Sequence, residues 1–247
     1  MNIKHALLSI LPLFIAVSVT VEARTPTFDP PLVSNDGKWL VSQGLTNCNR
    51  GVYVWSTEGG RKFKIPNGVE PRISEDSRWV SAMHDTTLIV IDLHHGTETT
   101  FESVIDYEIS RFSAYLIYLE ATEDNAQTGT LHAYELDGDR DMTWDRVEEF
   151  AIFQEDADAY AHLAYVVADD ETGGDALEIA VIGYAKRGWG SRGSYKGESI
   201  SDLSWAQDSI TLAFFDTGIL GSKPITWHAP AEAMEGRFTR TDSGEEL

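Results

Sequence analysis

Three short segments of this sequence carry residue types that perform chemistry in proteins: a glycine-rich stretch, an alternating run of acids and a histidine pair. In the glycine-rich stretch, Gly188 and Gly193 have the spacing of a phosphate-binding loop. Such a loop cradles phosphate with backbone amides and with a lysine directly after the second glycine. Ser194 stands where that lysine is required, and no strand-to-helix pattern surrounds the stretch. We therefore expect Gly188–Gly197 to be an exposed, flexible connection.

The acidic run has the oxygen-ligand spacing of a calcium-binding loop. Asp137, Asp139 and Asp141 alternate, and Glu148 lies eleven residues after the first of them. A calcium loop needs glycine at its sixth position for a sharp turn, and this chain has Met142 there. The segment is better interpreted as a hairpin turn that leads into a strand, and we predict no metal site.

The histidine pair, His94-His95, lies at a turn and has no partner at metal-ligand spacing. No His-Glu-x-x-His pattern is present, so we expect solvent-facing turn residues. The other histidines on strand candidates are expected to be packing positions; they are His84, His132 and His162.

No nucleophile motif is present either. The string Trp189–Gly193 reads Trp-Gly-Ser-Arg-Gly, with tryptophan where a Gly-x-Ser-x-Gly elbow needs its first glycine. The single cysteine, Cys48, excludes an intramolecular disulfide and is expected to be a structural thiol. The sequence thus predicts no catalytic residue, no cofactor-binding residue and no metal ligand.

The elements that would position any site are set by a unit that recurs about five times. Its clearest copies are Ser34–Val41 and Ser74–Ser81, and fainter copies follow at Ser110–Leu116, Leu163–Val166 and Ala206–Ala213. A fixed period of about 40 residues is typical of propeller blades, including WD-like repeats. The recurring aromatic residues are expected to anchor the core between blades; they are Trp39, Trp79, Tyr115 and Tyr165.

Short strands rich in β-branched and aromatic residues, with frequent turn signals, predict an all-β protein. The pattern is β-propeller-like, with about five four-stranded blades. The last blade is expected to be incomplete, because only Ile210–Phe215 and Pro224–Trp227 read as strands before a polar tail. Both a closed ring and an open arc of a larger propeller are compatible with the same strands.

Three parts of the chain are distinguished by composition. Residues 1–23 read as a cleavable signal peptide, because the apolar stretch Ala6–Val19 is too short to span a bilayer. Residues 24–228 form the predicted repeat domain, and residues 229–247 form the polar tail. The expected location is periplasmic or secreted, with no membrane insertion after cleavage.

The charge is strongly acidic, with 19 Lys plus Arg against 40 Asp plus Glu and a net charge of −21. This balance argues against nucleic-acid binding, which needs a basic footprint. It is typical of a solvated surface on an exported protein.

With these residues in view, the chain resembles the N-terminal β-propeller of bacterial prolyl oligopeptidase family serine peptidases. The resemblance is carried by Leu32–Trp39, Pro71–Val80 and Leu88–Leu93 closed by Gly96. The Ser-x-Asp-Gly-x-Trp repeat is also similar to blades of periplasmic propellers of the Tol system. In the peptidase family, catalysis belongs to a hydrolase domain that is absent from this chain, so no catalytic residue is carried over. The resemblance implies a gating and docking role.

The expected function is that of a non-catalytic exported propeller that binds a peptide or protein partner. Two alternatives stay open from sequence. One is a truncated or frameshifted fragment of such a peptidase, and the other is a periplasmic enzyme with a site in the propeller channel.

Overall fold

The computed structural model describes most of the chain between residues 30 and 240. The described ranges are 30–46, 49–110, 115–122, 125–138, 140–153, 160–169, 173–183, 189–206, 211–218, 221–228 and 237–240. The predicted signal peptide, Cys48, Asp139 and most of the polar tail lie outside them. Within these ranges every regular element is a β-strand and every strand pairing is antiparallel. They contain no helix long and apolar enough to cross a membrane.

The first two sheets are four-stranded, with strands in sequence order. Blade 1 consists of β1 (Leu32–Val33), β2 (Trp39–Thr46), β3 (Asn49–Ser56) and β4 (Lys62–Pro66). Blade 2 consists of β5 (Val69–Ile73), β6 (Trp79–His84), β7 (Thr87–Asp92) and β8 (Glu98–Phe101). These confirm the predicted four-strand unit.

The middle of the chain forms one seven-stranded sheet rather than two separate blades. Its strands are β9 (Val104–Ile109), β10 (Tyr115–Thr122), β11 (Asn125–Glu135), β12 (Asp141–Phe153), β13 (Tyr160–Asp169), β14 (Gly174–Gly183) and β15 (Trp189–Gly197). The sheet is continuous because β12 pairs with β11 from Asp141 to Val147 and with β13 from Val147 to Phe153. β12 is therefore the outer strand of blade 3 (β9 to β12) and the inner strand of blade 4 (β12 to β15).

The bend that lets one strand serve two blades lies beside Val147. Both pairings of β12 shift register there, and Arg146 has a φ of 60°. A bulge bends and twists the strand that carries it, so β12 can leave one blade and enter the next without a loop.

The last sheet corrects the prediction of an incomplete blade. Blade 5 has four strands: β16 (Ile200–Trp205), β17 (Thr211–Gly218), β18 (Gly221–His228) and β19 (Arg237–Arg240). The fourth strand lies inside the predicted polar tail, where Phe238 is the only large apolar residue of Arg237–Arg240. β19 pairs with β18 at all four of its residues, although its composition does not suggest a strand.

The glycine-rich stretch is also corrected. Residues 189–197 form β15, which pairs with β14 along most of its length, so this part of the stretch is not a flexible connection. β15 is the outer edge of its sheet, and an edge strand tolerates glycine and polar residues because only one side must pair.

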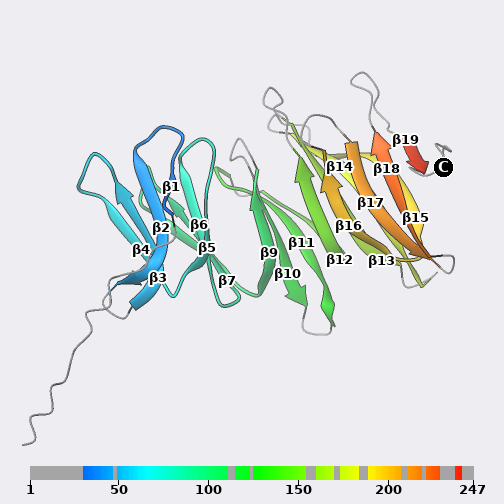
Figure 1. Ribbon diagram of the computed structural model, residues 1–247, viewed down its shortest axis with the longest axis horizontal. Coiled ribbons are helices and arrows are strands. Elements are labelled where there is room, and N and C mark those ends of the chain that lie inside the picture. The colour runs from blue at the N-terminus through cyan, green and yellow to red at the C-terminus, as the bar shows by residue number, and fades with distance from the viewer. Residues whose placement is uncertain are drawn as a thin grey trace, which may run out of the picture.

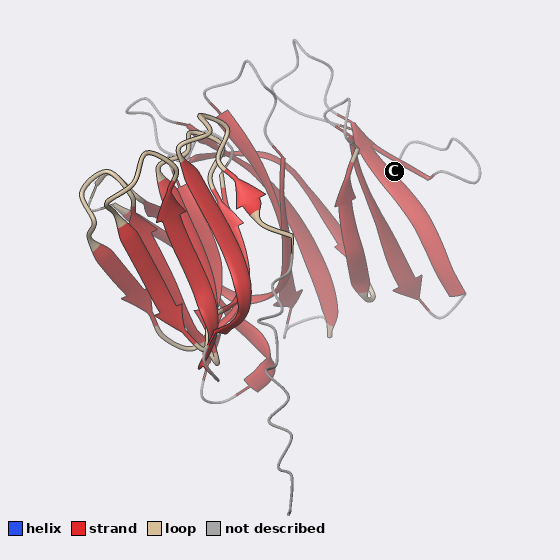
Figure 2. Ribbon diagram, turned by 60° about the vertical axis from the view of Figure 1, so that its left-hand side comes forward, coloured by secondary structure: helices blue, strands red, loops and turns tan. Residues whose placement is uncertain are grey.

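Four apolar clusters lie between successive blades. They join blade 1 to blade 2, blade 2 to blade 3, blade 3 to blade 4 and blade 4 to blade 5. The predicted anchors belong to three of them, with Trp39, Trp79, Tyr115 and Tyr165 all buried. Among the described residues no such cluster joins blade 5 to blade 1, and the two blades lie at opposite ends of the molecule (Figure 1). The blades thus form an open arc (Figure 2).

The repeated Ser-x-Asp segment closes the first hairpin of blades 1 and 2 in the same way. In blade 2, the Ser74 hydroxyl donates to Asp76 over 2.6 Å and accepts the Trp79 amide over 2.8 Å. The corresponding distances for Ser34, Asp36 and Trp39 are 2.6 and 2.9 Å. Both serines are buried, so the polar residues of the repeat hold the turn together.

Candidate binding groove

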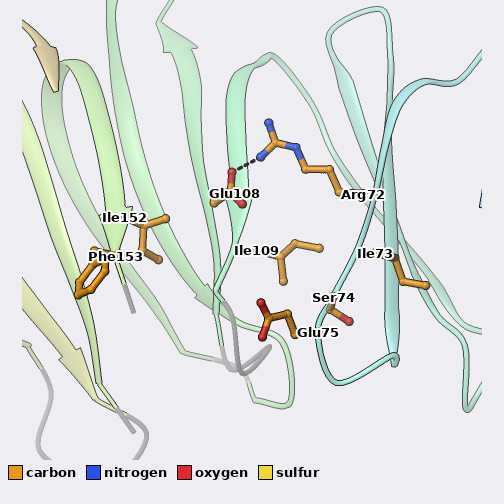
Figure 3. Close-up of a pocket in the computed structure, with 8 residues that line it drawn as sticks. All are labelled: Arg72, Ile73, Ser74, Glu75, Glu108, Ile109, Ile152 and Phe153. Carbon is orange, nitrogen blue, oxygen red and sulfur yellow. Dashed lines mark hydrogen bonds and ion pairs between the residues drawn. The ribbon is translucent and has the colours of Figure 1, made fainter. Parts of the chain in front are cut away.

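A groove of about 410 Å³ lies among the inner strands of blades 2, 3 and 4. Strands β5 and β9 each form the edge of a sheet, and the second half of β12 pairs with β13 alone. Figure 3 shows the residues of β5, β9 and β12 around the groove, with Glu108 and Ile109 between the other two strands. Such an edge offers N–H and C=O groups that can pair with an added extended segment.

Arg72 on β5 is the cation of the groove, and β9 holds it in place. Its guanidinium donates to the Tyr107 carbonyl oxygen over 2.5 Å and forms an ion pair with Glu108. The guanidinium also lies over the Tyr107 ring, 4.5 Å from its centroid. A guanidinium held by a carboxylate and an aromatic face loses little freedom when it binds a further group.

Tyr107 in turn is fixed by blade 2. Its hydroxyl donates to the Glu70 carbonyl oxygen over 2.9 Å and accepts the Ser81 hydroxyl over 3.3 Å. Burial raises the pKa of the Tyr107 hydroxyl, so it stays protonated and keeps donating at physiological pH. The contact couples the inner strands of blades 2 and 3 next to the residues that line the groove.

Glu108 shares the groove with a second carboxylate, Glu75. Burial raises the pKa of Glu108, the Arg72 charge opposes this, and nearby Asp106 adds to it. The backbone oxygen of Glu75 accepts the side-chain amide of Asn35 over 2.9 Å, which links the groove to the turn of blade 1. One guanidinium and two carboxylates therefore line the polar part of the groove.

The opposite side of the groove is apolar. Ile109 is buried, while Ile152 and Phe153 at the end of β12 are half-buried. Figure 3 shows both β12 side chains across the groove from Arg72. Phe153 stacks on Trp205 of blade 5, with ring centroids 5.7 Å apart. The groove is amphipathic, and its shape and lining suit a short peptide segment with one apolar and one charged side chain.

Among the described residues that line this groove, Ser74 is the only one with a hydroxyl side chain. Its hydrogen is directed to Asp76 and its oxygen accepts the Trp79 amide. A nucleophile needs a base that receives its proton while its oxygen is directed to the substrate, and the Ser74 hydroxyl is committed to the turn.

Two smaller hollows lie between neighbouring blades. One of about 360 Å³ lies between blades 2 and 3 and contains Arg78, which bonds Asp92 over 2.9 Å and Asp137 over 2.5 Å. Another of about 350 Å³ lies between blades 1 and 2 and contains Arg61, which donates to the carbonyl oxygens of Leu93 and His94. In both, the arginine already bridges two blades.

The acidic run does not gather its carboxylates in the part of the chain that the structure describes. Asp137 contacts Arg78, whereas the Asp141 carboxylate lies 2.9 Å from His132 Nδ1. Glu148 is exposed on β12, and Asp139 lies outside the described ranges. No group of three or more metal-ligating side chains is found among the described residues.

The histidines occupy the places that the sequence predicts, with one exception. His94 and His95 lie exposed in the turn after β7, and the ring of His95 is 2.8 Å from Asp92. His162 is buried, and His132 stacks on Tyr118 at 4.5 Å between ring centroids. His84 is the exception, because it lies half-exposed at the end of β6.

The sequence reasoning missed the residues that line the groove. It used Pro71–Val80 only as evidence for the family resemblance. Aligning the copies on their serines would have placed Arg72-Ile73 before Ser74 and Glu108-Ile109 before Ser110. That shared position, just before the turn, marks the inner strand of each blade.

Comparison with solved structures shows the fold alone. One similar structure is the β-propeller domain of the Trilobed protease from Pyrococcus furiosus, which is described as having an open velcro topology. It is 11% identical to this chain with a TM-score of 0.45, and the match covers 90% of this chain and 71% of that one. A crystal structure of the eukaryotic initiation factor is 13% identical with a TM-score of 0.50, over 91% and 55% of the two chains. A prolyl endopeptidase structure is 12% identical with a TM-score of 0.38, over 90% and 42%.

The chain thus spans about half the length of the last two structures. No protein-family model and no curated protein matches it. The assignment of a propeller architecture rests on the successive antiparallel four-stranded blades themselves.

Proposed function

We propose that this chain is a non-catalytic, exported propeller domain that binds an extended peptide or a protein segment in the groove between β5, β9 and β12. The observation that carries the proposal is the combination of open strand edges with a preorganised Arg72–Glu108 pair and an apolar wall. The proposed export rests on the apolar stretch Ala6–Val19.

Each part of the groove has a role in this proposal. The edges of β5 and β9 pair with the ligand backbone, as in strand addition to a sheet. Ile109, Ile152 and Phe153 cover an apolar ligand side chain, at about 25 cal/mol for each Å² removed from water. Arg72 and the two carboxylates orient charged groups on either side of it.

The proposed gating role follows from the place of the groove. It lies among inner strands, where a segment from a partner protein would lie across the axis of the arc. Bound there, the propeller would limit access to whatever site the partner places beside it.

A pull-down with a defined peptide mixture tests the proposal. The purified chain is immobilised and exposed to a casein digest, and the retained peptides are identified by mass spectrometry and titrated by calorimetry. Phe153→Ala and Arg72→Gln are each expected to weaken binding about tenfold or more, which corresponds to about 1.4 kcal/mol. The matched control Glu98→Gln alters an exposed residue of β8 outside the groove and should bind as the original chain does.

Retention of no peptide, or equal binding by the groove variants and the control, would refute the groove as the site. Cleavage of the retained peptides that persists after repurification would instead favour an enzyme.

A further inference from the structure

The groove among β5, β9 and β12 carries more negative than positive charge. Among the described residues that line it, Arg72 is the only basic one, whereas Glu75 and Glu108 are acidic. The charge of Arg72 is already engaged, because one of its guanidinium nitrogens donates both to the Tyr107 carbonyl oxygen and to Glu108. With this ion pair counted, the residues that line the groove keep a net negative charge.

Further acidic residues lie on the strands that frame the groove. In β5, in β9 and in β12 from Val147 onward, the only basic residue is Arg72. The acidic residues of the same segments are Glu70, Asp106, Glu108, Glu148 and Glu149. The net charge of the whole chain, −21, has the same sign. A field of one sign favours the approach of ligands of the opposite sign.

Two of these framing acids act on residues at the groove. Burial raises the pKa of Glu108, the Arg72 charge opposes the rise, and Asp106 adds to it. Burial also raises the pKa of Tyr107, and the charges of Glu108 and Glu70 add to that rise. Arg72 therefore does not fully offset the burial of Glu108 and its acidic neighbour. A second positive charge beside Glu108 would stabilise its charged form.

The two lining carboxylates flank the apolar part of the groove. Figure 3 shows Glu75 and Glu108 on either side of Ile109, with the β12 side chains Ile152 and Phe153 facing all three. In an extended segment, side chains two positions apart lie on the same side, roughly 7 Å from each other. A ligand side chain that packs on Ile109 and Phe153 therefore has its neighbour two positions away beside a carboxylate.

We propose that the groove takes an extended peptide segment with a lysine or arginine side chain two positions from an apolar one. This inference rests on the proposed function and specifies the class of ligand. The open strand edges and the apolar wall make the site, and Glu75 and Glu108 select the charge of what enters it.

The alternative charge is disfavoured by the same contacts. A ligand carboxylate would meet two carboxylates and an arginine that is already bonded, and such like-charge contact works against the wrong partner. Arg72 serves the cationic ligand indirectly, because it holds Glu108 in place and opposes the rise in its pKa. The loss of binding expected for Arg72→Gln follows from that support.

The test compares three synthetic peptides that differ in one side chain. The first is Thr-Ser-Thr-Phe-Thr-Lys-Thr-Ser, and the others have glutamine or glutamate in place of the lysine. Both ends are capped, so that the termini carry no charge. Calorimetric titration of the purified chain in low salt should show the lysine peptide binding about tenfold more tightly than the glutamine peptide, and the glutamate peptide binding most weakly. The preference for lysine should shrink as salt is raised, because salt screens exposed charges such as Glu75.

Variants of the acids locate the preference in the groove. Glu75→Gln changes only an exposed side chain and should reduce the ratio of lysine to glutamine binding about threefold or more. Adding Glu108→Gln should abolish the preference. Glu98→Gln is the matched control, because it removes the same charge from an exposed residue of β8 outside the groove. It should keep the full preference.

Four results would overturn the inference: equal binding of the three peptides, tightest binding of the glutamate peptide, binding of none of them, or a lysine preference that survives the double variant. If one of these occurs while peptides of the casein digest still bind in a way that depends on Phe153, the proposed function stands without the cation preference. A digest from which nothing is retained, together with three peptides that do not bind, refutes both.

Discussion

The serine that opens each clear copy of the repeat has its hydroxyl between two polar partners inside a turn. Ser74 accepts the buried Trp79 amide and donates to Asp76, whose other contact is the Arg78 amide at 3.0 Å. Loss of one partner leaves a buried amide without its acceptor, and that costs more than the bond contributes. The serine and aspartate of the repeat therefore stabilise the turn.

Replacing Ser74 with alanine tests this role. Ser74→Ala should lower the free energy of unfolding by about 1–3 kcal/mol, because the Trp79 amide becomes an unsatisfied buried donor. Urea denaturation monitored by tryptophan fluorescence measures the change. Ser194→Ala on β15 is the control, since Ser194 is exposed and its change should be within about 0.5 kcal/mol. Equal losses in both variants would contradict the assigned role.

Among the described residues, Asp92 is a buried carboxylate with several donors around it. Burial alone would raise its pKa, but hydrogen bonds from Arg78, from the His95 ring and from two backbone amides outweigh burial and hold the pKa well below its ordinary value. The hydrogen bond to Asp92, and a second one to Asp137, raise the pKa of Arg78. Asp92 is thus a charged link inside the hairpin of blade 2 and toward blade 3.

The lowered pKa of Asp92 predicts a loss of stability in acid. A carboxyl whose folded pKa lies below its unfolded value stabilises the fold above the unfolded pKa, and the contribution is lost as the pH falls through the folded value. The loss should therefore begin below about pH 4, the ordinary range of an aspartate. Asp92→Asn should flatten the fall in unfolding free energy between neutral and acid pH, measured by urea titrations at several pH values.

Asp85→Asn is the control for this experiment, because the Asp85 side chain is 93% exposed. It should leave the acid slope unchanged. An acid slope that is the same in Asp92→Asn and the original chain would refute the stabilising role of the Asp92 charge.

At the scale of elements, β12 is the strand that departs from the repeat. It leaves blade 3 and enters blade 4 through a residue with positive φ, Arg146, rather than through a loop. A positive φ is strained for residues with a side chain and most strained for β-branched ones. The stability of the bend should therefore depend more on the backbone preference of residue 146 than on the area that its side chain buries.

Substitution at Arg146 measures that strain. Arg146→Val should lower the free energy of unfolding by about 1–3 kcal/mol relative to Arg146→Gly, because valine resists the left-handed conformation and glycine accepts it. Thermal and urea unfolding of the two variants give the comparison. Equal stability of the two variants would show that the bend carries no such strain.

The strands that sequence analysis predicted well are those with strong apolar alternation. Pro224–Trp227 falls within β18, and Ile210–Phe215 overlaps β17 from Thr211 onward. Other strands depend on pairing that composition does not reveal. Trp189–Gly197 has few apolar residues, and Glu148-Glu149 in the middle of β12 looked like part of an acidic surface.

The groove was only partly open to sequence reasoning. Arg72 and Glu108 each lie two residues before a repeat serine, whereas Phe153 on a third blade has no such marker. Only the curvature of the arc brings them together, so their residue types gave no indication of proximity. By contrast, the aromatic anchors could be predicted because burial at equivalent repeat positions follows from the period alone.

At the scale of the whole molecule, the five blades differ in how many neighbouring blades they pack against. In the part of the chain that the structure describes, blades 2, 3 and 4 contribute to an apolar cluster on both faces, whereas blades 1 and 5 contribute on one face only. In a linear array, stability is approximately the sum of the units and their nearest-neighbour interfaces. The end blades should therefore open at lower free energy than the middle ones.

Native-state hydrogen exchange tests this order. Amides of β2 and β3 in blade 1 should exchange faster than those of β13 and β14 in blade 4 under conditions that favour the native state. Peptide-resolved mass spectrometry gives both protections in one sample. Equal protection along the chain would instead indicate a single cooperative unit.

The shared strand β12 has a consequence for how this molecule can change its size. Blades 1 and 2, 2 and 3, and 4 and 5 are joined by residues 67–68, 102–103 and 198–199, where a recombination event could add or remove whole blades without cutting a strand. Between blades 3 and 4 any such event would sever β12 in mid-strand. Residues 104–197 therefore form one double-sized module, which such an event would have to add or remove as a unit.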